Sequence, residues 1–465
     1  MTPRPKGRFL LLLLLAATTT AGAQQRYTLS ARQAADLAGK NNVQVKNALI
    51  DIALQEQTNR EITANAYPQV NGNFGITYNP LVLAQRFPNF IALGTYGVLS
   101  QEGVKNGSGQ SIVTPSDIGF IEAAFGTKWN NNAGISLTQL LFEGQVFIGL
   151  QARKASMEFA QKAAELTGQN LRANVYKVYY QLAAAKYSIR IIDDNIALVQ
   201  KLADDTRKIY SAGFAEKLDI DKVTVQLNNL ATQRQQVLNG LNNGYLGLKF
   251  LLGLPAKDSL VLTDTVSYDE VRSDILDATQ YTYSDRKEFQ LAEKGIELNK
   301  FNIRRYQLTY LPTAALSSNY SLLRQADKFG FGGPWSKGAS IGLNISVPIF
   351  DGFAKAARVQ KARLTLQQAQ NNLEGLKNTI DMQVLTARNN FNNAVATLEI
   401  QKRNIELAEK VYNQTRKKYE IGSGSQTEIS LANTNLQAAQ NNYIAALYDA
   451  IVARVDFLNA TGKLQ

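Results

Sequence analysis

Two clusters of side chains recur along this 465-residue chain with the same internal spacing. Each has an arginine, a tyrosine and a glycine at intervals of three residues: Arg207, Tyr210 and Gly213, then Arg416, Tyr419 and Gly422. Glycine permits the backbone conformation that a tight reversal between two helices needs. The pattern therefore favours one of two interpretations, a recognition surface at a pair of helix turns or simple turns with solvated charges.

Most catalytic chemistry is excluded by composition. The chain has no histidine and no cysteine, which rules out Ser-His-Asp and Cys-His catalysis, metal ligation by those residues, and disulfides. Two carboxylate pairs, Asp193-Asp194 and Asp204-Asp205, remain for a hydrolase, but both lie inside a helical segment and are interpreted as a solvated face. We therefore expect no enzyme activity, no cofactor and no metal.

Residues 1–23 have the pattern of a secretory signal peptide. Three cations, at positions 4, 6 and 8, precede an apolar run, and Ala21-Gly22-Ala23 fits the rule for cleavage sites. We expect a mature chain 24–465 without an N-terminal lipid, because Gln24 rather than cysteine follows the site. The formal charge of +12 is scattered along helices among acidic residues, which together with export disfavours nucleic-acid binding.

Matched residues divide the mature chain into two copies. Ala48 and Pro68 recur as Ala292 and Pro312, 244 positions later, whereas Phe142-Glu143-Gly144 recurs as Phe350-Asp351-Gly352 after 208 positions. Copy one therefore has about 36 extra residues between Pro68 and Phe142. We place repeat one at about 28–253, a lateral insert at 254–283 and repeat two at about 284–465.

Each copy has the same predicted order of a helix, two strands, a long helix and a return helix. The strands alternate between an apolar face and a face rich in amides and serine, and are expected at 68–79, 130–142, 312–324 and 338–350. The helices are expected at 30–66, 145–209 and 217–252, then at 284–310, 353–419 and 428–458. The longest have about 65 residues, or roughly 98 Å, so they must pack lengthwise as coiled coil in a mainly α chain.

The four strands require more than one chain. An open sheet of four strands in lipid would leave two unpaired edges, and the smallest membrane barrels have about eight strands. No stretch after the signal is long and apolar enough for a membrane helix, so any crossing falls to the strands. Counting alone allows two, three or four chains, and a trimer would supply twelve strands.

This order of features resembles the TolC-like outer-membrane efflux protein family (the outer membrane factors of tripartite efflux and type I secretion systems). The resemblance covers residues 28–463 and rests on the duplicated order of elements and the paired Tyr-x-x-Gly turns. Locally, Tyr27-Thr28-Leu29-Ser30 leads the first helix, and residues 285–289 (Asp-Arg-Lys-Glu-Phe) resemble the family's Asn-Arg-Pro-Glu-Leu. Lys287 stands where that motif has proline, and Asn42-Val43 where the family often has Asn-Pro.

The resemblance implies a homotrimer that forms a β-barrel in the bacterial outer membrane, continued by a long periplasmic α-helical tunnel. The implied partners are a periplasmic adaptor (membrane fusion) protein, an inner-membrane pump of the RND, ABC or MFS type, and outer-membrane lipid. The implied function is a passive exit duct of a tripartite efflux pump or type I secretion system. Drugs, metals, peptides and proteins all fit as cargo.

The resemblance also implies roles for the residues at the periplasmic tips. Those expected to dock the adaptor are Arg207, Tyr210, Gly213, Phe214, Arg416, Tyr419, Gly422 and Gly424. Among the gate candidates, Asp219 and Tyr419 match a linking acid–phenol pair, and Glu428 matches an acidic ring on the threefold axis. Leu431 replaces a second acidic ring and Gly424 a linking arginine, so the constriction is expected to be partly apolar.

Aromatic and apolar residues mark the other end of the chain. Trp129 and Trp335 each precede the second strand of a hairpin, which favours an aromatic girdle at the membrane interface over packed loop anchors. The outer loop 80–128 is too apolar for a fully solvated loop, so we expect it to fold over the outer mouth or contact a neighbouring protomer.

The alternative function is a periplasmic coiled-coil scaffold or adhesin with a β-rich head, which the apolar face of all four strands disfavours.

Overall fold

The structure is a computed structural model that describes residues 25–124, 126–268, 271 and 280–464. The predicted signal peptide and part of the lateral insert lie outside the described residues. The chain divides into two compact units, one of residues up to 57, 153–300 and 363–465, the other of residues 58–152 and 301–362.

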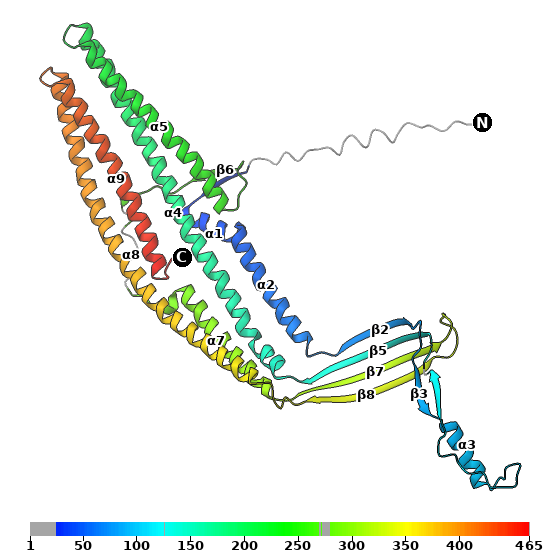
Figure 1. The fold of residues 1–465 in the computed structure, drawn as a ribbon. Coiled ribbons are helices and arrows are strands. Elements are labelled where there is room, and N and C mark those ends of the chain that lie inside the picture. The colour runs from blue at the N-terminus through cyan, green and yellow to red at the C-terminus, as the bar shows by residue number, and fades with distance from the viewer. Residues whose placement is uncertain (1–24, 125, 269–270, 272–279, 465) are drawn as a thin grey trace, which may run out of the picture. The chain divides into compact units, whose positions relative to one another are not determined.

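Long helices make up most of the first unit (Figure 1). Two of them, α4 (Gly144–Ser211) and α8 (Ala354–Glu420), have 68 and 67 residues. Each is followed by a return helix of 35 residues, α5 (Lys217–Leu251) or α9 (Gln426–Ala460). Within the described part of the chain, no helix combines the length and hydropathy that crossing a membrane requires.

The helix predicted over residues 30–66 is two helices, so this prediction is wrong in one respect. The structure has α1 (Ala31–Asn41) and α2 (Val43–Ala64), and Asn42 between them is extended, with φ of −62° and ψ of 135°. The Asn42 side chain accepts a hydrogen bond from the Gln44 amide at 2.8 Å and donates one to the Leu251 carbonyl at 2.9 Å. Asn42 thus caps α2 and also satisfies a carbonyl at the end of α5.

Arg286 occupies the corresponding junction before α7 (Lys287–Gln307). Its side chain is buried, donates to the Ala460 carbonyl at the end of α9 at 2.6 Å, and pairs with Glu288. A cation at a helix C-terminus is favourable because the last carbonyls carry partial negative charge. In both halves, therefore, a polar side chain joins the end of a return helix to the start of another helix.

The lateral insert is tied to the helices by a short sheet and two tyrosines. Strand β6 (Ser259–Leu262) pairs in parallel with β1 (Arg26–Leu29), a strand that the sequence did not predict. Asp381 of α8 accepts hydrogen bonds from Tyr281 at 2.7 Å and Tyr283 at 3.0 Å. The bond to Asp381 raises the pKa of Tyr281 to about 12, because ionising this phenol would place a second negative charge beside the carboxylate.

The second unit contains an antiparallel sheet with the order β2-β5-β7-β8. Its strands are β2 (Gln69–Tyr78), β5 (Trp129–Phe142), β7 (Thr313–Ala326) and β8 (Ser336–Ser346). In register, Phe74 lies opposite Ala133, Ala133 opposite Leu322, and Ser318 opposite Ile341. The alternation therefore collects large apolar side chains on one face and asparagine, serine and glycine on the other.

The β7–β8 loop folds back over the apolar face of this sheet. Asn131 is fully buried and donates to the Gly330 carbonyl at 2.9 Å, and Arg324 donates to the Gly332 carbonyl at 2.5 Å. The Phe329 ring lies 4.7 Å from the Trp129 ring, measured between centroids. Trp129 therefore belongs to an aromatic cluster on the sheet, whose other members are Phe74, Tyr78, Phe329 and Phe331.

Trp335 differs from Trp129 in its surroundings. It lies in the same loop, and its indole N–H donates to the Phe331 carbonyl at 3.1 Å.

The outer loop 80–128 contains regular structure, a ribbon of β3 (Ala84–Pro88) and β4 (Phe120–Ala124) with helix α3 (Phe90–Gln101) between them.

Candidate functional site

Both helix reversals of the first unit end in the same backbone motif. Gly213 has φ of 81° and Gly422 has φ of 74°, in the left-handed region that favours glycine. The Phe214 amide donates to the Ile209 carbonyl at 3.0 Å, and the Ser423 amide donates to the Lys418 carbonyl at 3.0 Å. These are the hydrogen bonds of a Schellman motif, which satisfies the last carbonyls of α4 and α8.

The return helices begin with acidic side chains that accept backbone hydrogen bonds. Asp219 accepts from the Glu216 amide at 3.3 Å. Glu428 accepts from the Ser425 amide at 3.2 Å, and the Ser425 hydroxyl accepts from the Glu428 amide at 3.2 Å, which completes a capping box. These two acidic gate candidates therefore also stabilise the start of a helix.

The two tip tyrosines have different surroundings, although their sequence positions match. Tyr210 is 45% exposed, whereas Tyr419 is 8% exposed and its hydroxyl lies 3.2 Å from the Thr206 hydroxyl. Thr206 donates its own proton to the Leu202 carbonyl at 2.8 Å, so Tyr419 is the donor to Thr206. The Asp219–Tyr419 pair that the resemblance implies is not formed within the described chain.

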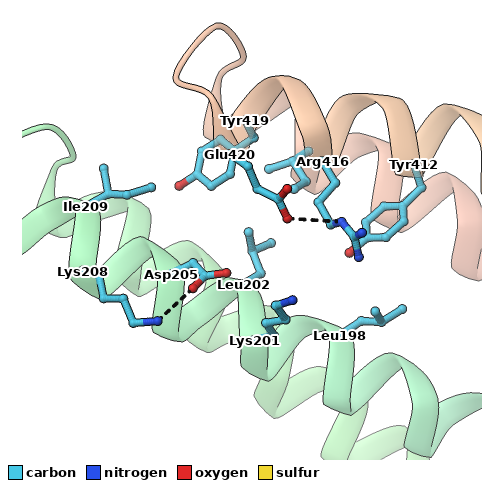
Figure 2. Close-up of a pocket in the computed structure, with 11 residues that line it drawn as sticks. Leu198, Lys201, Leu202, Asp205, Lys208, Ile209, Tyr412, Arg416, Tyr419 and Glu420 are labelled. Carbon is cyan, nitrogen blue, oxygen red and sulfur yellow. Dashed lines mark hydrogen bonds and ion pairs between the residues drawn. The ribbon is translucent and has the colours of Figure 1, made fainter.

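A cavity of about 330 Å³ lies beside Tyr419, between α4 and α8 (Figure 2). Its walls carry paired charges, Lys208 with Asp205 at 3.1 Å and Arg416 with Glu420 at 3.4 Å. The rest of its lining is mostly apolar and includes Leu198, Leu202, Ile209, Tyr412, Tyr419 and Ile429. Burial raises the pKa of the Tyr412 phenol above its ordinary value.

The remaining tip residues are exposed or lie in the turns. Phe214 is 85% exposed and Leu431 is 60% exposed. Arg207 pairs with Asp204 at 2.9 Å. At Gly424, a Cβ atom would lie 3.0 Å from the Tyr419 backbone nitrogen, so the turn leaves little room for the arginine that the family has there.

Two features of the tips were not predicted from the sequence. One is the partnership of Thr206 with Tyr419. The other is a row of buried amides at seven-residue spacing along α9, Gln426, Asn433 and Gln440. Asn195 of α4 donates to Gln440 at 2.7 Å. Buried amides at such spacing fix the register of packed helices, and the spacing itself was the signal in the sequence.

The apolar face of the sheet is the second candidate site. It carries exposed large side chains from all four strands, including Val70 (62%), Ile135 (57%), Tyr320 (47%) and Ile341 (79%). The opposite face carries Asn71, Ser136, Asn319 and Ser340 in register. Such a difference between faces suits a sheet with hydrocarbon on one side and water on the other. Among the described residues, no group of three or more acidic side chains could hold a metal ion.

Comparisons with known proteins show what this chain is similar to. A model of the outer membrane efflux protein family matches residues 280–463. Outer membrane protein TolC of Vibrio cholerae is 20% identical over 337 residues, which are 72% of this chain and 77% of that protein. Outer membrane efflux protein BepC of Brucella suis is 22% identical over 343 residues, covering 72% and 73% of the two chains.

The fold has solved counterparts as well. A crystal structure of CusC, from work on folding and transmembrane channel formation, has a TM-score of 0.70 at 18% identity and covers 93% of this chain and 92% of its own. This likeness shows that the chain shares the fold of the CusC chain. By sequence, the chain resembles TolC-like outer membrane efflux proteins, and the family model covers its residues 280–463. Its relatives are named as outer-membrane and efflux proteins rather than enzymes.

Proposed function

We propose that three copies of this chain form an outer-membrane exit duct for an efflux pump or type I secretion system. The observation that carries the proposal is the sheet, with an apolar face across all four strands and a polar face behind it. Its strands have 10 to 14 residues, and a tilted strand needs roughly 9–11 to cross a bilayer.

Closure into a barrel follows from the sheet's edges. Within the described chain, β2 and β8 each pair on one side only, and they run antiparallel to each other because the order β2-β5-β7-β8 alternates in direction. The β8 edge of one copy can therefore take the β2 edge of the next as an antiparallel neighbour. The backbone groups of both edges would then be satisfied in lipid. Three copies give twelve strands, with the amide-rich faces lining the lumen.

The periplasmic adaptor docks at the helix tips in this proposal. Phe214, Tyr210 and Ile421 are exposed beside the two glycine turns, and the cavity between α4 and α8 is lined by both apolar and charged side chains. A partner helix with apolar residues at one face and charges at its rim fits such a surface. An inner-membrane pump of the RND, ABC or MFS type would supply the cargo.

The gate at the tips combines charge and apolar residues. Glu428 of three copies would form an acidic ring, and Leu431, one turn further along α9, an apolar one. The acidic ring would favour cations. Because Tyr419 is bonded to Thr206, any role of its hydroxyl in opening requires breaking that bond.

Electron microscopy of the protein extracted from the outer membrane in mild detergent tests the proposal. A hollow tube with threefold symmetry, together with steady conductance in planar bilayers, is expected. A solid rod, or a protein that stays in solution without detergent, would instead support the scaffold or adhesin.

A further inference from the structure

Helix α3 of the outer loop has no polar face. Successive residues of a helix are rotated by roughly 100°, which spreads its six largest apolar side chains around the whole axis. They are Phe90, Ile91, Leu93, Tyr96, Val98 and Leu99. No residue between positions 87 and 101 is charged. A helix that is apolar all round is normally surrounded by core or by lipid.

Nothing in the described chain surrounds this helix. None of its residues is buried, and Phe90, Ile91 and Val98 are 55%, 62% and 60% exposed. The flanking segments are also apolar, since Leu81 is 90% exposed and Leu83 is 74% exposed. Exposed apolar surface of this extent marks an interaction site.

The connection to the sheet restricts where the helix can be. β2 ends at Tyr78 and β3 begins at Ala84, so the link between them spans at most roughly 22 Å. The β3–β4 ribbon must therefore start beside the rim of the sheet. If the strands cross the outer membrane, this rim lies at the outer leaflet.

We propose that α3 inserts into the outer leaflet of the outer membrane and contacts lipid on all its sides. This inference rests on the proposed function, because it takes the apolar face of the sheet as lipid-facing. The helix has 12 residues, or roughly 18 Å, which is too short to cross a hydrocarbon core of about 30 Å. It lies in the membrane without spanning it.

The other possible occupants fit the helix less well. A lid over the mouth of a duct would keep one side of α3 in water, and a contact with a neighbouring copy would cover one side. Either would favour a polar or charged strip along the remaining surface, and the residues that could form it are only Thr95, Ser100 and Gln101, at separate angles. Lipid is the one partner that needs no such strip.

Single cysteines test this inference cleanly, because the chain has none of its own. Leu93→Cys and Val98→Cys lie roughly 140° apart around the helix. Each variant is labelled with an environment-sensitive fluorophore and placed in vesicles of brominated phospholipid or exposed to aqueous iodide. We expect brominated lipid to quench both labels and iodide to quench neither. Iodide quenching at either position, or protection of either label from both quenchers, overturns lipid contact and supports a lid or a protein interface.

Two labels on the sheet separate this inference from the proposed function. Ile341→Cys lies on the apolar face and Asn319→Cys on the polar face. With the sheet in a barrel, brominated lipid quenches the first and iodide the second. If this pattern holds and the α3 labels fail, only the insertion of α3 is wrong. If the Ile341→Cys label is not quenched by lipid, the membrane placement of the sheet fails and both proposals fall.

Discussion

At the scale of the residue, Glu428 combines two tasks that a substitution can separate. Its carboxylate accepts the Ser425 amide in a capping box, and in the proposed trimer its charge faces the threefold axis. Glutamine can hold the same capping box, because its amide oxygen also accepts. The charge of residue 428 can therefore be removed without removing its capping hydrogen bond.

Glu428→Gln should lower the preference of the duct for cations while leaving the helix start in place. The lost interaction between charge and helix dipole is about 0.3–1 kcal/mol. Glu428→Ala should lower the preference equally and also lose the capping hydrogen bond, a further ~1 kcal/mol. Reversal potentials in asymmetric salt measure selectivity, and thermal unfolding measures the cap. An unchanged reversal potential in both variants would remove Glu428 from the gate.

Tyr281 contributes to the folding stability of the chain, and this contribution is lost at alkaline pH. Its pKa is raised to about 12 by the hydrogen bond to Asp381, above the ordinary value of 10. The folded state thus holds the phenolic proton more tightly than the unfolded state does. This contribution is complete below pH 10 and is lost as the pH rises from 10 through 12.

We therefore expect the melting temperature of the unsubstituted protein to fall more steeply between pH 10 and 12 than that of Tyr281→Phe. Asp381→Asn should flatten the same part of the curve, because it removes the charge that raises the pKa. Tyr210→Phe, at an exposed tyrosine, is the matched control and should leave the slope unchanged. Parallel curves for Tyr281→Phe and the unsubstituted protein would contradict the assignment.

At the scale of the element, a glycine-to-alanine substitution has opposite effects on stability in a helix turn and inside a helix. Gly422 has φ of 74°, where an alanine costs roughly 1–2 kcal/mol. Gly375 lies inside α8, and no neighbouring atom of the described residues comes within 4 Å of where an alanine Cβ would lie. Alanine there stabilises a helix by roughly 0.5–1 kcal/mol. Gly422→Ala should speed hydrogen exchange around the tip, and Gly375→Ala should slow it in the surrounding helix. Equal exchange at the tip in both variants would show that the turn does not need glycine.

The elements whose signals are local were the ones predicted from sequence. The glycines at 213 and 422 mark the reversals, and alternation marks the four strands of the sheet. The break at Asn42 was missed because apolar spacing continues past it, and its partner, Leu251, is distant in sequence. Strand β1 has four residues and owes its existence to β6. The Thr206–Tyr419 bond was missed for the same reason, since packing brings the two residues together.

At the scale of the whole molecule, the proposed barrel closes where the sheet edges of neighbouring copies meet. Each copy offers one β8 edge and one β2 edge, so neighbours join head to tail around a ring. The strand order alone does not determine how many copies the ring contains. In the proposed trimer, the tilt and shear of the barrel and the packing of the helices would select three copies.

Disulfide crosslinking counts the copies directly. Ile341→Cys in β8 is combined in turn with a cysteine at Val70, Gly72, Phe74 or Ile76, which share the apolar face of β2. Only a residue directly opposite Ile341 in the neighbouring copy brings the Cβ atoms near the roughly 3.5–4.5 Å that a disulfide needs. One position, or two adjacent ones on this face, should therefore crosslink on oxidation.

The crosslinked products should be linked pairs and linked triples of chains, and nothing larger. Each single-cysteine variant should give at most pairs, because one cysteine cannot extend a chain of links. If the largest crosslinked product has two chains or four, the ring has a size other than three. The contact between the β8 and β2 edges would still be confirmed. No product at any β2 position would mean that β8 and β2 are not neighbours, and the barrel would have to close through some other contact. The number of chains in the largest crosslinked product thus tests the ring size. The β2 position that reacts with Ile341→Cys tests which strand edges close the ring.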